Sequence, residues 1–130
     1  MFTKQVAALA LAACALMPLG ARAADVSGEI SNAATHAGLA ASASDIAGVH
    51  MHLHHAVNCL VGPNGAGFDA KELNPCANSG GGAIPDSSNA TVKQALLGAV
   101  AKANSGIAAT DLATAQKDAS ETAAMLKAVK

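Results

Sequence analysis

The segment IAGVHMHLHHAVNCL, residues 46–60, carries both the clearest fold signal and the clearest chemical signal of the chain. Its apolar residues recur at spacings of three and four, at Ile46, Val49, Leu53, Val57 and Leu60. This spacing is typical of an amphipathic helix, which we expect over residues 44–61. Gly62 and Pro63 follow at once, and these two residue types commonly mark the end of a helix.

Four of the five histidines lie within six residues of this predicted helix. Residues four apart on a helix lie one above the other, so His50 and His54 form a stacked pair beside the apolar stripe. His52 lies on the opposite flank. Two imidazoles at this spacing can converge on one metal ion, and we therefore predict His50 and His54 as metal ligands.

The fifth histidine, His36, lies on a preceding helix that the apolar pattern predicts over residues 27–41. Residues 42–45 read as a turn that starts the second helix. An antiparallel hairpin then brings His36 within about one helical turn of His50, where it supplies a third ligand. In the alternative, one continuous helix, the two histidines would be about 21 Å apart and could not share an ion.

A second possible site consists of Met51 and His55, again four residues apart. Soft thioether sulfur beside imidazole suits copper, above all Cu(I). The alternative is an exposed methionine beside a solvated histidine. For the main site the candidate ions are copper, nickel and zinc, with copper favoured by the general order of divalent affinities.

The N-terminus has the features of a secretory signal peptide, which we place at residues 1–23. An apolar run over residues 6–20 precedes the small-residue site Ala21-Arg22-Ala23. The alternative is a bacterial lipoprotein acylated at Cys14, in the sequence Leu-Ala-Ala-Cys. We expect a mature domain of residues 24–130, periplasmic or secreted and without a transmembrane segment.

Charge and composition restrict the partners. Loss of residues 1–23 removes two of the eight basic residues and none of the nine acidic ones, which leaves a charge of about −3. Phe68 is the only aromatic residue beyond the predicted cleavage site. With no basic patch and no aromatic stacking surface, nucleic acid is not an expected partner. The expected partners are a metal ion and, as a further candidate, another protein of the cell envelope.

The mature chain retains an even pair of cysteines, Cys59 and Cys76. In an oxidising compartment we expect them to form a disulfide, closing a loop worth about 3 kcal/mol in the chain-entropy model. The alternative is that both thiols are metal ligands. The bond would fasten a long glycine- and proline-rich loop, residues 62–87, with Phe68 as its apolar anchor.

Two further helices are predicted over residues 89–104 and 110–129. Four helices joined by short connections and one long loop predict an all-α fold. We expect a small antiparallel four-helix bundle with one disulfide-stapled loop, after a cleaved signal peptide.

The motifs favour binding over catalysis. The chain has no Gly-x-Ser-x-Gly, no His-Glu-x-x-His and no closely spaced carboxylate pair, and we expect no enzyme activity. The predicted function is transition-metal buffering, sequestration or delivery. Two alternatives remain: a bundle that binds haem b through histidine, and a ligand-free structural or interaction protein of the envelope.

Overall fold

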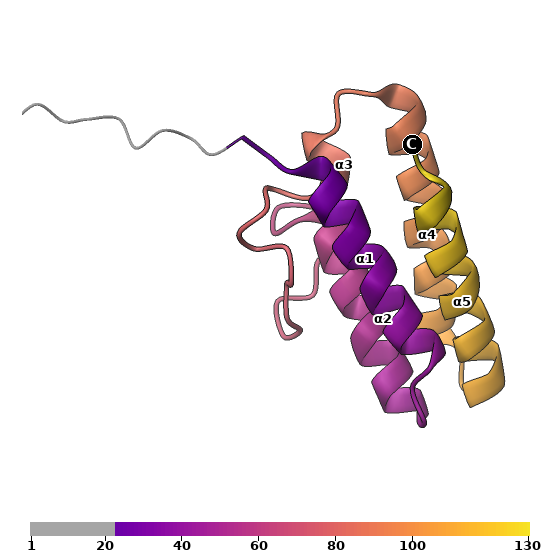
Figure 1. Cartoon of the computed structure of the whole chain (residues 1–130). Coiled ribbons are helices and arrows are strands. Elements are labelled where there is room, and N and C mark those ends of the chain that lie inside the picture. The colour runs from indigo at the N-terminus through magenta and orange to yellow at the C-terminus, as the bar shows by residue number, and fades with distance from the viewer. Residues whose placement is uncertain (1–22) are drawn as a thin grey trace, which may run out of the picture.

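The computed structural model describes residues 23–130, so the predicted signal peptide and Cys14 lie outside the described residues. The described chain is all-helical, with no strand between residues 23 and 130, and this confirms the all-α prediction. The helices are α1 (Val26–Ala41), α2 (Ile46–Val61), α3 (Ala83–Asp86), α4 (Ala90–Ala108) and α5 (Leu112–Ala128) (Figure 1).

The four long helices lie side by side and alternate in direction along the chain (Figure 1). Short turns join α1 to α2 and α4 to α5, so each of these pairs is an antiparallel hairpin. The two hairpins pack together, with α1 against α5 and α2 against α4. The result is a bundle-like arrangement. Between residues 23 and 130, none of the helices combines the length and apolar character that a membrane crossing requires.

Aspartate side chains start three of the long helices. Asp25, Asp45 and Asp111 each accept a hydrogen bond of 2.8 to 2.9 Å from the backbone N–H three residues later. Such caps contribute about 1 kcal/mol each, because they satisfy an N–H that has no partner within the helix. These caps place the helix starts one or two residues away from the predicted residues 27, 44 and 110.

Helix α4 continues four residues beyond its predicted end at residue 104, through Gly106 to Ala108. Packing explains this difference. Gly106 is buried, and a Cβ atom at this position would lie 2.6 Å from Cδ1 of Leu53 on α2. Gly106 therefore allows α4 to pack closely against α2, and α4 continues through this residue despite the low helix propensity of glycine.

Helix α2 is the most deeply buried element. All seven residues from His55 to Val61 are buried, so its second half has no solvent-exposed face. Alanine and leucine residues of the other long helices cover one side, including Ala33 and Ala37 of α1 and Leu96 of α4. A helix buried on every side needs a second cover, and the long loop provides it.

We call residues 62–82 the strap. It runs from the end of α2 to the start of α3 and lies on the side of the α1–α2 hairpin away from α4 and α5 (Figure 1). Its two ends meet: a Cβ atom on Gly62 would collide with the carbonyl oxygen of Gly81. Gly62 and Gly82 both have positive φ, 70° and 114°, which other residues rarely adopt. Both ends of the strap therefore depend on glycine.

The predicted disulfide is present and fastens the strap. Cys59 on α2 is bonded to Cys76, with their Cα atoms 5.1 Å apart. Phe68 is partly buried and packs against a core cluster that includes residues of all four long helices, as expected for the anchor of the loop. The predicted loop 62–87 differs in one respect, because its last residues form the short helix α3.

Candidate metal centre

Three histidines come together between α1 and α2: His36, His52 and His55. One ligand nitrogen from each lies within 4.8 Å of the other two. His52 and His55 are three residues apart on α2 and therefore share a face of that helix. The antiparallel hairpin brings His36 of α1 opposite them.

The spacing of the rings is close to what a metal ion requires. Nδ1 of His36 lies 3.4 Å from Nδ1 of His52. Two ligands in a tetrahedral site with bonds of about 2.0 Å are about 3.3 Å apart. The ring centroids are separated by 5.2 to 5.6 Å, and the ring of His55 is nearly perpendicular to the other two. The three rings thus converge from different directions and do not stack.

His55 is the buried member of the group, with 7 % of its surface exposed. Its Nε2 lies 3.4 Å from Oε2 of Glu72 in the strap. Its Nδ1 is buried and has no hydrogen-bond partner among the described residues. An orphaned buried nitrogen is rare in folded proteins and calls for an explanation, such as an ion bound to it.

The surroundings favour neutral imidazole at two of the three positions. Burial lowers the pKa of His36, and the neighbouring rings of His55 and His52 lower it further. Burial also lowers the pKa of His55, although Glu72 acts in the opposite direction. Only unprotonated imidazole coordinates a metal ion, so both shifts favour the ligand form.

Asn58 determines where the strap passes over α2. Its side chain is fully buried, and its Nδ2 donates to the carbonyl oxygens of Asp69 at 2.9 Å and Leu73 at 3.2 Å. Its Oδ1 accepts from the N–H of Asp69 at 2.9 Å. Because Asn58 follows His55 by three residues, the turn of strap that it holds places Glu72 beside His55.

The other two histidines of α2 lie in different surroundings. Nε2 of His50 donates to the carbonyl oxygen of Ala109, at 3.1 Å, in the connection between α4 and α5. Nδ1 of His54 lies 3.6 Å from Oδ2 of Asp69 in the strap. The structure therefore does not bring His50 and His54 together with His36, which is the set that the sequence predicted.

The difference has a physical reason. Helical periodicity places His50 and His52 on opposite flanks of α2, but it does not say on which flank α1 lies. That depends on the direction in which the turn at residues 42–45 folds the chain. In the structure α1 faces the flank of His52 and His55. The spacing of three residues between His52 and His55 was the sequence signal for that pair. Glu72 lies in irregular chain, where no periodicity could indicate its position beside His55.

The members of the second predicted site, Met51 and His55, differ in their exposure to solvent. Met51 is exposed, whereas His55 is buried within the three-histidine group. Cys59 and Cys76 form a disulfide with each other, which excludes the alternative in which both thiols are metal ligands.

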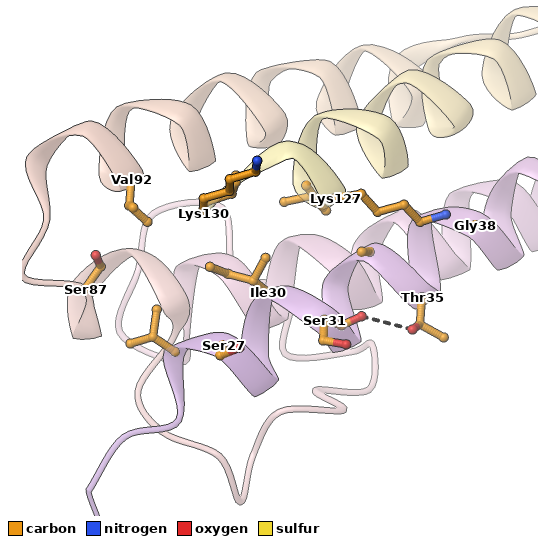
Figure 2. Close-up of a pocket in the computed structure, with 13 residues that line it drawn as sticks. Ser27, Ile30, Ser31, Thr35, Gly38, Ser87, Val92, Lys127 and Lys130 are labelled. Carbon is orange, nitrogen blue, oxygen red and sulfur yellow. Dashed lines mark hydrogen bonds between the residues drawn. The ribbon is translucent and has the colours of Figure 1, made fainter.

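Two cavities lie away from the histidines. The larger, about 730 Å³, is lined by α1 as far as Gly38, by the C-terminal end of α5, and by Ser87 and Val92 near the start of α4 (Figure 2). Its lining is partly apolar, including Ile30 and Val92, with Lys127 and Lys130 at the rim (Figure 2). The second, about 490 Å³, lies beside the end of α2. Neither lining contains a histidine, so neither cavity supports the haem alternative.

Comparison with known proteins gives no match: no protein-family model, no curated protein and no solved structure matches the chain. The geometry of the site is therefore the basis for a functional proposal.

Proposed function

We propose that the protein binds one transition metal ion through His36, His52 and His55. One observation carries the proposal: three imidazoles from two helices have ligand nitrogens within 4.8 Å of one another. Three nitrogen ligands suit zinc, copper(II) or nickel(II), and they do not suit calcium or magnesium, which prefer oxygen.

The role that we propose is buffering, sequestration or delivery of the ion, without catalysis. His36 and His52 are half-buried, so solvent and an incoming ion can reach one side of the site. Three protein ligands leave a coordination position for water or for a residue of a receiving protein. An ion held in this way can be both captured and passed on.

We further propose that the protein is periplasmic or secreted, with residues 1–23 as a cleaved signal peptide and the four long helices as a four-helix bundle. The Cys59–Cys76 disulfide supports export, because such bonds persist mainly in oxidising compartments. Intact-mass analysis of the exported protein tests this, with an N-terminus at Ala24 or Asp25 expected. A lipid-bearing species beginning at Cys14 would indicate a membrane-anchored protein instead.

Metal titration of five single variants tests the site. Replacing His36, His52 or His55 by alanine should reduce the affinities for zinc(II), copper(II) and nickel(II) by more than about 100-fold. Removal of a ligand is expected to exceed the 10- to 100-fold losses that changes around a site cause. His50→Ala and His54→Ala are matched controls on the same helix, and their affinities should stay within about 3-fold of wild type.

Two results would contradict the proposal. One is a wild-type protein that binds none of the three ions at pH 7.5. The other is a loss of affinity confined to His50→Ala and His54→Ala, which would restore the site predicted from the sequence.

Affinity should also fall as the pH drops below about 6, because protons compete for imidazole nitrogen. Absorbance near the Soret band after addition of haem would reveal haem binding in the same samples.

A further inference from the structure

The strap carries more than a stabilising disulfide. We propose that Glu72 is the outer-shell partner of the metal site and directs the ion to Nδ1 of His55. This inference rests on the proposed function, since it specifies how one of the three ligands is oriented. Glu72 would be a positioning residue, with no bond of its own to the metal.

The two ring nitrogens of His55 are in opposite situations. Nε2 faces the carboxylate of Glu72 at 3.4 Å, whereas Nδ1 is buried and no residue from 23 to 130 hydrogen-bonds to it. A carboxylate can only accept a hydrogen bond, so contact with Glu72 favours the tautomer that carries its proton on Nε2. In neutral His55 this leaves Nδ1 with a free lone pair. An ion at Nδ1 would give the orphaned atom its missing partner.

The other members of the group offer the same atom. Nδ1 of His36 and Nδ1 of His52 already face each other at 3.4 Å. With Nδ1 of His55 as the third ligand, the site would be built from three Nδ1 atoms. Metal-binding histidines commonly donate their other ring N–H to a carboxylate, which fixes the ring and strengthens it as a ligand.

The position of Glu72 depends on two fastenings of the strap. Asn58 binds the carbonyl oxygens of Asp69 and Leu73, on either side of Glu72. The Cys59–Cys76 disulfide then ties the strap to α2 four residues further along. Both fastenings lie within four residues of His55 on α2. A flexible loop would lose conformational entropy when it brought a carboxylate to the ring, whereas this strap has already lost it on folding.

Zinc affinity tests the role of Glu72. The probe is Zn²⁺, in competition with a chromogenic chelator, and the protein is the full exported chain with its disulfide intact. Glu72→Ala should bind Zn²⁺ about 10- to 100-fold more weakly than wild type. Glu72→Gln should fall between the two, because an amide oxygen still accepts a hydrogen bond but carries no charge. Glu121→Ala is the matched control, which removes the same charge from α5 and should leave the affinity unchanged.

Nitrogen-15 NMR of the histidine rings supplies a readout that a purely structural role would not change. In the metal-free wild type, His55 should be the Nε2–H tautomer, and Zn²⁺ should shift the Nδ1 resonance. In Glu72→Ala the tautomer preference should be lost. Zn²⁺ on Nε2 of His55, or equal Zn²⁺ affinity of Glu72→Ala and Glu121→Ala, would overturn the inference and leave the three-histidine site standing. A wild type that binds none of Zn²⁺, copper(II) and nickel(II) would instead overturn the proposed function.

Discussion

The two flanks of helix α2 carry the same residue type in different surroundings. On one flank, His52 and His55 meet His36 of α1, and the buried Nδ1 of His55 has no hydrogen-bond partner in the part of the chain that the structure describes. On the other, His50 is bonded to the chain between α4 and α5. His54 is paired with Asp69 in the strap. One flank therefore gathers three imidazoles, while on the other His50 and His54 each contact an oxygen of the protein.

This difference shows that a concentration of histidines on a helix does not by itself say which of them come together. A histidine whose nitrogen already donates to a carbonyl oxygen must lose that bond before it can bind an ion. Nδ1 of His55, which has no hydrogen-bond partner among the described residues, loses nothing of this kind. The neighbours of each ring decide its role, and the neighbours come from elements distant in sequence.

The largest effect is expected from Asn58→Ala, which should release the strap from α2 and alter both flanks together. The side chain is fully buried and makes at least three hydrogen bonds to the strap. Their loss, with buried polar groups left unpaired, should lower the free energy of unfolding by about 3 kcal/mol. Urea denaturation measures this change, and the same variant should bind Zn²⁺ more weakly because Glu72 is no longer held.

Asn78→Ala is the matched control for that experiment. Asn78 is exposed in the same strap, so its replacement should change the free energy of unfolding by less than about 0.5 kcal/mol. Equal stabilities of the two variants would mean that Asn58 does not hold the strap as its hydrogen bonds indicate.

An intermediate effect is expected from His50→Ala, and it should separate stability from metal binding. This variant loses the hydrogen bond to Ala109, so its free energy of unfolding should fall by about 1 kcal/mol. Its metal affinity should stay close to wild type. His52→Ala should show the reverse pattern in the same two assays. If both variants lost stability and affinity together, the two flanks would not be functionally distinct.

The smallest effect is expected from His54→Ala. Nδ1 of His54 and Oδ2 of Asp69 are 3.6 Å apart, and their side chains are 27 % and 32 % exposed. Ion pairs of this kind contribute a few tenths of a kcal/mol, so the unfolding midpoint in urea should move very little. A decrease of more than about 1 kcal/mol in the free energy of unfolding would show that His54 helps to hold the strap on α2.

Much of the fold could be read from local patterns. Helical periodicity and turn residues indicated the four long helices, and the end of α2 at Val61 came from Gly62 and Pro63. The pairing of Cys59 with Cys76 followed from an even count of cysteines in a chain predicted to be exported. The concentration of histidines in α2 also indicated, correctly, where a possible metal site would lie. Each of these features is encoded within a few neighbouring residues.

The tertiary structure decided which histidines meet. The pattern along α2 defines two flanks, but the fold of the turn at residues 42–45 selects the flank that faces His36. Gly106 is a second example. Glycine locally favours the end of a helix, but in the structure α4 continues through Gly106, which packs against Leu53. Glu72 reaches His55 only because Asn58 and a disulfide fix an irregular strap over α2. Periodicity specifies the faces of a helix, and only packing specifies what each face meets.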